Sequence, residues 1–386
     1  MPFSRELRLL VVTHHITAGF GGTPESVLLL ANHLKAIEVS VDVLSAEGLS
    51  RDIGERVSLP SPENHESHPR RELNLSHYQA VLIAGSWNPS AISVSSRARR
   101  MGIPVSYAAK GNLCKVEFSR PRDSKKLLYL VTLELIPLAL ARTVVFSSNL
   151  ERESTIIPAT LLKRKQIRVV PEPFRILVQR RTGSLQEPEK SDGLTLGFLA
   201  EISPRKGLME LVAGFLKWLD EGADIYQPRL RVAGDPRPGS ERYLERVKSY
   251  ARHHPLGGAI GWEVGKRGKA RTDFYRQVDI FACPSRFESF GLTPLEALWE
   301  GTPVVCGPRI GALEYLPNAT CLGIFKSLTP RQIAAELEVT RTDLAKARTE
   351  AMVFREEIVR AFGGKSLTKS FASALFLNAG ESPFQK

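Results

Sequence analysis

Short runs of aliphatic and β-branched residues alternate along the first half of the chain with longer amphipathic segments. The runs predicted as strands are residues 9–12, 39–44, 80–84, 104–108, 143–147 and 168–170. The segments predicted as helices are residues 24–35, with Thr23 as N-cap, 89–101 and 124–141. Strands that alternate with helices in this way favour an α/β fold, in which helices cover both faces of a parallel sheet.

The same alternation restarts after a polar stretch over residues 179–193. The predicted strands there are residues 194–199, 229–233, 259–262, 280–282 and 303–306. The predicted helices are residues 204–219, with Ser203 as N-cap, 240–253, 270–277 and 294–300, and the tail over 330–378 is helical. We therefore predict two Rossmann-like domains, residues 1–178 and 194–365, joined by a linker over 179–193. For residues 366–386 we expect a C-terminal helix or tail that crosses back to the N-terminal domain.

The most apolar segment of the sequence covers residues 127–140. It is interrupted by Thr132, Glu134 and Pro137, and it is shorter than the roughly 18–20 apolar residues that span a bilayer. We therefore predict a buried helix over these residues. The apolar run at 9–12 is also too short for a secretory signal and is assigned to a strand.

Charge and cysteine content narrow the function classes. The chain has 53 basic and 41 acidic residues, and its net charge of +12 favours an anionic partner such as phosphate groups or a membrane surface. The basic residues are dispersed in short runs outside any nucleic-acid-binding module, so nucleic acid is not expected as a partner. The four cysteines lack CxxC spacing, which predicts reduced thiols in a cytoplasmic protein, without disulfides or a zinc site.

Residues 284–305 combine the end of a buried strand, a polar loop and the start of a helix. Open α/β sheets bind ligands at this carboxyl edge, and the free N–H groups of a helix start suit a phosphate. A carboxylate one turn into the helix, Glu296, could accept hydrogen bonds from ribose hydroxyls. Alternatively, Thr293 and Glu296 have the spacing of a capping box, which needs no ligand. The local sequence leaves both interpretations open.

A family resemblance favours the first interpretation. Glu288 and Glu296, with seven residues between them and Phe290-Gly291 inside, resemble the paired-glutamate motif of retaining glycosyltransferases of family 4. That family has the GT-B fold, in which two Rossmann-like domains place parallel sheets facing a central cleft. Weaker resemblances follow the family's order along most of the chain: Gly21-Gly22, Ile103-Pro104, Gly111-Asn112-Leu113, Val169-Val170-Pro171, residues 203–207 and Ala233-Gly234.

The resemblance implies a donor site in the second domain. Glu296 would bind the nucleotide ribose, and Glu288 would face the hydroxyls of the transferred sugar. Lys206 would neutralise the diphosphate, so Glu288 and Lys206 are the candidate catalytic residues. No metal and no other cofactor are expected, because fixed cations and helix N-termini can stabilise a departing diphosphate.

Backbone segments complete the implied donor site. The backbone of Phe290, Gly291 and Leu292 would approach the donor in the second domain. In the first domain, Gly21 and Gly22 would let the chain come close to the donor phosphates and the acceptor.

Three positions depart from the family pattern. Ala200-Glu201 stands where the family usually has Gly-Arg, so we expect Arg205 to supply the missing cation. Glu201 itself is expected to pair with Arg205 or to touch a sugar hydroxyl. Lys110 stands where a histidine often precedes the glycine, and is either an acceptor-phosphate contact or a surface lysine.

The acceptor-side candidates are His14, His15, Lys110 and Asn112. The tandem histidines follow the first strand. They either provide part of the polar contacts of this loop or are turn residues.

The leading hypothesis is a retaining, metal-independent, hexosyltransferase-type glycosyltransferase (EC 2.4) that uses a nucleotide-sugar. Its acceptor would be a glycan or a lipid-linked glycan in surface polysaccharide or glycoconjugate biosynthesis. The expected location is cytoplasmic, with peripheral attachment to the anionic inner face of the membrane. One alternative is a non-catalytic, nucleotide-sugar-binding scaffold in which Glu201 has disabled diphosphate chemistry. Another is a sugar-nucleotide epimerase, which would release a free hexose.

Overall fold

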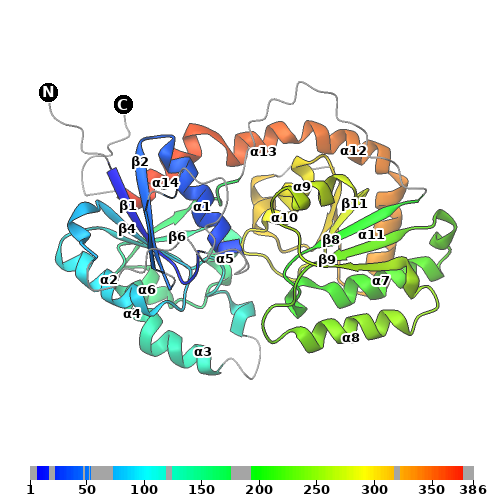
Figure 1. The fold of residues 1–386 in the computed structure, drawn as a ribbon, viewed down its shortest axis with the longest axis horizontal. Coiled ribbons are helices and arrows are strands. Elements are labelled where there is room, and N and C mark those ends of the chain that lie inside the picture. Colours follow the sequence, from blue (N-terminus) through cyan, green and yellow to red (C-terminus); the bar gives the residue numbers. More distant parts are fainter. Residues whose placement is uncertain are drawn as a thin grey trace. The chain divides into compact units, whose positions relative to one another are not determined.

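The computed structural model describes residues 7–16, 22–46, 48–51, 53, 73–118, 124–174, 193–316 and 322–376. The chain forms two compact units: unit 1 within residues 1–176 and 362–386, and unit 2 within residues 177–361. Each unit holds one sheet with helices on both faces (Figure 1). The predicted α/β class with two mostly parallel sheets is confirmed. Of the predicted linker, only Gly193 lies in the described part of the chain.

Unit 1 is built on a seven-stranded sheet of order β3-β2-β1-β4-β5-β6-β7. Its strands are β1 (Leu7–Val12), β2 (Val39–Ser45), β3 (Gly48–Ser50), β4 (Ala80–Ala84), β5 (Val105–Ala108), β6 (Thr143–Phe146) and β7 (Gln166–Val169). All neighbouring pairs are parallel except β2 with β3. The hydrophobic runs form central strands because both faces of the sheet are covered.

Two helices from opposite ends of the chain cover one face of this sheet. They are α1 (Gly22–Lys35) and α14 (Gly364–Phe376). Leu30 of α1 and Phe371 of α14 belong to the same core as Leu82 of β4. Helix α14, the last helix among the described residues, is therefore part of unit 1.

The other face of the unit 1 sheet is covered by α2 (Pro89–Arg100) and by a broken helix, residues 124–140. The broken helix consists of α3 (Ser124–Tyr129), a π-helical turn η7 (Leu130–Glu134) and α4 (Leu135–Leu140). Two short helices, α5 (Asn149–Ser154) and α6 (Ala159–Leu162), follow β6.

The prediction of a buried helix at 127–140 is wrong. Leu130 and Leu138 pack into the core, but Leu128 and Val131 are 66% and 61% exposed. The apolar residues of this segment therefore lie on both sides of the helix, and its composition alone could not show which side the sheet covers.

Unit 2 contains a six-stranded sheet of order β10-β9-β8-β11-β12-β13, in which all neighbouring pairs are parallel. Its strands are β8 (Thr195–Leu199), β9 (Arg229–Ala233), β10 (Ile260–Glu263), β11 (Ile280–Cys283), β12 (Val304–Cys306) and β13 (Leu322–Ile324). The strand order reverses between β8 and β11. In an open α/β sheet, the crevice at the carboxyl ends of such a strand pair is the usual ligand-binding position.

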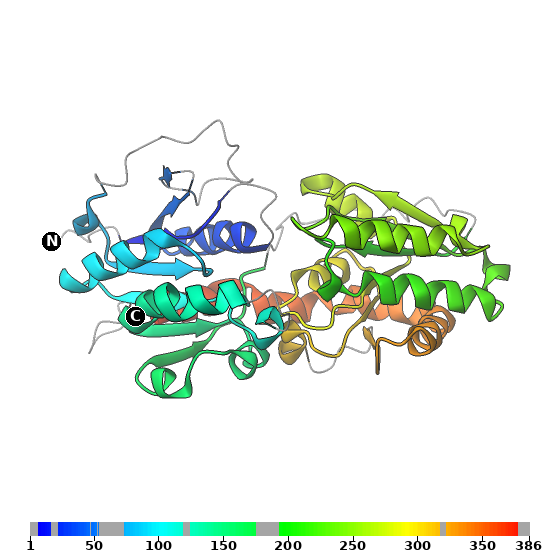
Figure 2. The same ribbon diagram turned by 90° about the horizontal axis from the view of Figure 1, so that it is seen from below.

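In the described residues, the α-helices of unit 2 are α7 (Leu208–Asp220), α8 (Glu241–Arg252), α9 (Gly268–Arg276), α10 (Leu292–Trp299), α11 (Pro330–Thr342), α12 (Leu344–Val353) and α13 (Arg355–Phe362), whose last residue begins the second segment of unit 1. Helices α7 and α8 lie side by side in both views (Figures 1 and 2). Phe215 of α7, Val247 of α8 and Leu337 of α11 share one core with Phe198 of β8. These three helices therefore cover the same face of the sheet.

The predicted helix over 204–219 is divided in the structure. A single 3-10 turn, η8 (Pro204–Lys206), comes first, and α7 begins only after Gly207, whose φ is +72°. Arg205 and Lys206 therefore precede the α-helix instead of lying in its first turn. The left-handed backbone conformation of Gly207 interrupts the helix, where the sequence pattern predicted a continuous one.

Candidate functional site

The loops that follow β8 and β11 touch each other at the switch point of unit 2. A Cβ atom at Gly207 would overlap the carbonyl oxygen of Pro284, so only glycine permits this approach at its positive φ. The backbone N–H of Arg286 donates to the carbonyl oxygen of Arg205 at 3.0 Å. The two loops are thus fixed to each other by the backbone.

Glu288 lies where these loops meet and is held between two cations. Its Oε1 lies 2.6 Å from Nζ of Lys206, and its Oε2 lies 3.3 Å from a guanidinium nitrogen of Arg205. The same guanidinium nitrogen donates to the carbonyl oxygen of Phe287 at 3.0 Å. The sequence motifs 203–207 and 284–291, more than seventy residues apart, therefore assemble one charged cluster.

The electrostatics of this cluster favour charged side chains. Glu288 is only 8% exposed, and burial alone would raise its pKa. The positive charges of Lys206 and Arg205 outweigh burial and lower the pKa of Glu288 to about 2. The carboxylate is therefore ionised at neutral pH, and the cluster carries a net charge of +1 from one anion and two cations.

The loop after Glu288 leads directly into a helix start. Gly291, with φ +97°, is the N-cap of α10, and a Cβ there would come within 2.6 Å of Ile310 Cγ2. Phe290 is buried, and its carbonyl oxygen accepts a hydrogen bond from Ala312 N–H at 2.8 Å. The first N–H groups of α10, starting at Leu292, therefore lie beside the loop that carries Glu288.

The capping-box interpretation of Thr293 and Glu296 is wrong. The cap is Gly291, and Thr293 lies inside the helix. Glu296 instead bonds to two side chains of α9: a guanidinium nitrogen of Arg271 lies 2.6 Å from its Oε1, and the hydroxyl of Tyr275 donates to its Oε2 at 2.7 Å. Its side chain is 18% exposed. The carboxylate is thus fixed in place and can accept further hydrogen bonds.

The structure also separates Glu201 from Arg205. Oε1 of Glu201 lies 3.8 Å from Nε of Arg237, whereas Arg205 pairs with Glu288. The expected Glu201–Arg205 pair is therefore wrong. The expected substitution of Arg205 for the missing family arginine stays a prediction.

The acceptor-side candidates of unit 1 follow the carboxyl ends of β1 and β5. His14 and His15 come directly after β1, with ring centroids 4.1 Å apart, and the His14 side chain is exposed. Asn112 lies in the turn after β5. Gly22 is the first residue of α1, while Gly21 lies outside the described residues. Their acceptor roles stay predictions.

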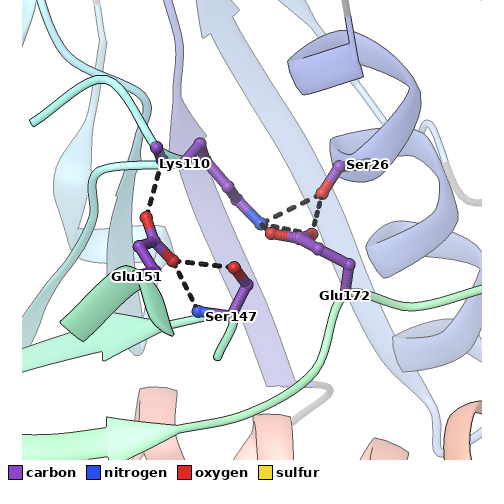
Figure 3. Close-up of polar contacts among 6 residues, drawn as sticks. Ser26, Lys110, Ser147, Glu151 and Glu172 are labelled. Carbon is purple, nitrogen blue, oxygen red and sulfur yellow. Dashed lines mark hydrogen bonds and ion pairs between the residues drawn. The ribbon is translucent and has the colours of Figure 1, made fainter. Parts of the chain in front are cut away.

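Lys110 forms an ion pair that leaves only 10% of its side chain exposed, so the surface-lysine alternative is wrong. Its Nζ lies 2.8 and 2.7 Å from the two carboxylate oxygens of Glu172 and 3.0 Å from the hydroxyl of Ser26, which also bonds to Glu172 (Figure 3). An acceptor phosphate would have to compete with Glu172 for this ammonium group. The carboxylate of Glu151 accepts a hydrogen bond from Gly111 N–H at 2.6 Å and so holds the turn that follows Lys110 (Figure 3).

Several residues that complete these clusters were missed from the sequence. They are Arg271 and Tyr275 beside Glu296, and Glu151 and Glu172 around Lys110. Glu172 follows the end of a predicted strand by two residues, a position that could have marked it as a sheet-edge polar group. Arg271 gave no such signal, because it lies in a helix rich in charged residues.

Comparison with known proteins finds similarity in the part of the chain that carries the charged cluster. Residues 180–340 match the family described as glycosyl transferases group 1. A glycogen synthase from Alkalilimnicola ehrlichii is 30% identical over 131 residues, which are 34% of this chain and 25% of that protein. A D-inositol 3-phosphate glycosyltransferase from Acidothermus cellulolyticus is 28% identical over 153 residues, 38% of this chain and 34% of that protein. The chain thus spans about a quarter to a third of the length of these curated relatives.

Among solved structures, Anabaena Alr3699/HepE in complex with UDP-glucose is similar over 95% of this chain and 98% of its own. The TM-score is 0.68, at 14% sequence identity. A likeness at this identity reports the fold, and it confirms the predicted GT-B class with one Rossmann-like sheet in each unit.

Proposed function

We propose that the chain, whose residues 180–340 match the glycosyl transferases group 1 family, transfers a sugar from a nucleotide-sugar donor. One observation carries the proposal: the switch point of unit 2 assembles Lys206, Arg205 and Glu288 beside the start of α10. A site with two cations and free helix N–H groups suits a diphosphate. The similar fold of a protein solved with UDP-glucose supports a nucleotide-sugar as the ligand.

In this proposal, each part of the cluster meets one part of the donor. Glu296, fixed by Arg271 and Tyr275, would accept hydrogen bonds from the ribose hydroxyls. Lys206 and the start of α10 would face the diphosphate. Glu288 would accept hydrogen bonds from hydroxyls of the sugar, which its low pKa permits because the carboxylate stays ionised.

Catalysis would come from charge stabilisation at the leaving group. When the bond between the sugar and the diphosphate breaks, negative charge grows on the departing phosphate oxygen. Lys206 and Arg205 are already oriented by Glu288 and the carbonyl of Phe287, so they need little reorganisation to stabilise that charge. We propose on this basis a metal-independent reaction. The resemblance of Glu288 and Glu296 to the paired-glutamate motif supports the further proposal that configuration is retained at the transferred sugar.

The acceptor proposed is a glycan or a lipid-linked glycan, which the protein would meet at the cytoplasmic face of a membrane. The net charge of +12 supports attraction to an anionic surface. In the described part of the chain, no helix has both the length and the apolar character that crossing a bilayer requires. The attachment that we propose is peripheral.

The experiment that tests the donor proposal combines a ligand screen with one matched pair of variants. Nucleoside diphosphates and nucleotide-sugars are screened by thermal shift, and binding of the best ligand is measured by calorimetry with and without a chelator. Lys206→Ala should weaken diphosphate binding at least tenfold and leave binding of the bare nucleoside unchanged. Lys217→Ala, which removes an exposed lysine paired with Glu221 on α7, is the control and should bind as the wild type does.

Three outcomes would count against the proposal. If no nucleotide stabilises the protein, the donor site is wrong. If Lys206→Ala binds diphosphate normally, the phosphate lies elsewhere. Donor binding without any donor hydrolysis or transfer would favour a scaffold, and loss of activity with the chelator, restored by Mg²⁺ or Mn²⁺, would overturn metal independence.

A further inference from the structure

The outward side of the broken helix in unit 1 is apolar. Leu127, Leu128 and Val131 are 52%, 66% and 61% exposed, and Leu133 and Ile136 are also exposed. These five residues, which we call the apolar strip, occupy a single ten-residue stretch of helix. Single exposed apolar residues are ordinary on a protein surface, but a row of five on one helix marks an interaction surface.

A buried carboxylate fixes the helix in this orientation. The only charged residue between 127 and 141 is Glu134, which is buried at 2% exposure. Its carboxylate accepts from Trp87 N–H at 2.8 Å and from the Tyr107 hydroxyl at 2.5 Å, and burial raises its pKa. The carboxylate of Glu134 thus faces the core, while Leu127 and Leu128 face outward. Rotating the helix to bury the strip would break these hydrogen bonds and expose Leu130 and Leu138, so the strip stays outside.

Basic side chains flank the strip at the end of α4. A guanidinium nitrogen of Arg99 lies 3.4 Å from the carbonyl oxygen of Leu140, and Nζ of Lys165 lies 2.5 and 2.6 Å from the carbonyl oxygens of Ala139 and Ala141. Both side chains contact carbonyl oxygens of residues 139–141, so the two cations lie close together, and burial and the charge of Arg99 lower the pKa of Lys165. Arg100, Lys163 and Arg164 are exposed beside them in the sequence.

Exposed acidic residues are absent from the helix itself and from the two segments that carry these cations. Residues 89–101, 127–142 and 158–169 contain no Asp or Glu apart from the buried Glu134. An apolar strip with basic side chains at one end has the composition of a surface that enters the headgroup region of an anionic bilayer.

We propose that the apolar strip and the basic residues beside α4 form a docking surface for anionic phospholipid, which holds the protein on a membrane without spanning it. A second copy of the chain fits this surface less well, because a two-fold contact would add a second set of the same basic residues. Nucleic acid would leave the leucines without a partner. The proposal deepens the peripheral attachment proposed above, and it can be tested without any donor.

The test measures binding of the whole protein to lipid vesicles by co-sedimentation. One vesicle preparation is phosphatidylcholine alone, and the other contains equal parts of phosphatidylcholine and phosphatidylglycerol. The wild type should bind the anionic vesicles more tightly, and added salt should weaken that binding. Replacing both Lys163 and Arg164 by Gln should weaken it roughly 25-fold, since each basic side chain near an anionic surface contributes about fivefold. Leu128→Ser with Val131→Ser should weaken binding roughly tenfold or more.

Matched double variants in unit 2 separate this surface from general charge and hydrophobicity. Ile225 and Val264 are 72% and 74% exposed, and Arg242 and Arg246 are exposed on α8. Ile225→Ser with Val264→Ser, and Arg242→Gln with Arg246→Gln, should bind vesicles as the wild type does. Circular dichroism and urea unfolding confirm that each variant is folded, and the test uses no donor, so a failure here is distinct from a failure of the donor proposal.

Equal binding to both vesicle types by the wild type would overturn the proposal. So would equal losses in the unit 1 and unit 2 variants. A concentration-dependent dimer that dissociates in Leu128→Ser with Val131→Ser, without vesicle binding by the wild type, would assign the strip to a second copy of the chain instead.

Discussion

The ion pair between Lys206 and Glu288 allows a prediction with a worked magnitude. The perturbation is Lys206→Met, which keeps the length of the side chain and removes its charge. The pKa of Glu288 is about 2, against an ordinary 4.5, which corresponds to roughly 3 kcal/mol of stabilisation of the ionised form. The charge of Lys206 favours ionisation of Glu288 more strongly than any other group does, and Arg205 remains at 3.3 Å in the variant. We expect the free energy of unfolding to fall by about 2 kcal/mol at pH 7.

The pH dependence of this loss has a definite sign. A carboxylate with a lowered folded-state pKa stabilises the fold above its unfolded pKa, here about 4.5, and loses that contribution as the pH falls toward 2. The difference between wild type and Lys206→Met should therefore be full at pH 7, shrink below about pH 4.5 and vanish near pH 2. Other acid-sensitive groups are common to both proteins and cancel in the difference.

The assay is urea unfolding followed by tryptophan fluorescence. Trp218, Trp262 and Trp299 lie in unit 2, so the signal reports mainly on the unit that holds the site. The double variant Lys206→Met with Glu288→Gln should recover about 1–2 kcal/mol relative to the sum of the single variants. Lys217→Met is the control, because its exposed pair with Glu221 should contribute less than about 0.5 kcal/mol.

Binding adds a second consequence of the same geometry. Glu288→Gln removes the anion that occupies Lys206, so a nucleoside diphosphate should bind this variant at least as tightly as it binds the wild type, while sugar transfer falls. If the stability losses of the two single variants simply add in the double variant, the coupling between Lys206 and Glu288 is refuted. Equal losses of diphosphate affinity in Glu288→Gln and Lys206→Met would refute the division of roles between sugar and diphosphate.

Three further substitutions test other parts of the two units. Glu296→Ala should weaken nucleoside binding about tenfold or more in calorimetry, because charge-assisted hydrogen bonds contribute about 1.5–3 kcal/mol. Unchanged binding would show that Glu296 does not bind the ribose. Gly207→Ala should lower the melting temperature far more than Gly239→Ala, because both have positive φ but only Gly207 has a carbonyl oxygen where the Cβ would lie. Lys110→Met should lower the free energy of unfolding in urea by about 3–5 kcal/mol, because it leaves the Glu172 carboxylate without its cation. Adding Glu172→Met should restore most of this loss, since neither charge then remains. Similar losses in the single and the double variant would contradict the ion pair.

Much of the fold could be predicted from the sequence, because buried parallel strands are runs of aliphatic and β-branched residues between longer helices. Two strands were missed: β3, only three residues long, and β13, whose short run Leu322–Ile324 follows Cys321 without an amphipathic helix before it. Strands of three residues carry too little pattern to stand out. Their pairing depends on the neighbouring strand.

The partners of individual side chains were harder to predict from the sequence than the helices and strands. The motif around Glu288 and Glu296 predicted where ligand chemistry should lie, and Lys206 was included through its resemblance to a family loop. Arg271 belongs to α9, and its approach to Glu296 depends on how α9 and α10 pack. The capping box failed for a related reason: Gly291 takes a positive φ and ends the loop one residue before Leu292, which local residue preferences at Thr293 did not reveal.

The pre-formed cluster at the switch point also has an energetic logic. Two neighbouring cations beside a helix start would repel each other and oppose the positive end of α10 if they stood alone. Glu288 offsets this repulsion in the protein without donor, so Lys206 and Arg205 can be kept in fixed positions instead of turning toward solvent. A diphosphate brings more negative charge than one carboxylate, and could therefore take over the cations while Glu288 turns to a neutral hydroxyl partner. The ion pair would thus stabilise the unit and keep Lys206 and Arg205 in position until the donor binds. This is why the loss of Lys206 should affect stability and affinity together, whereas the loss of Glu288 should separate them.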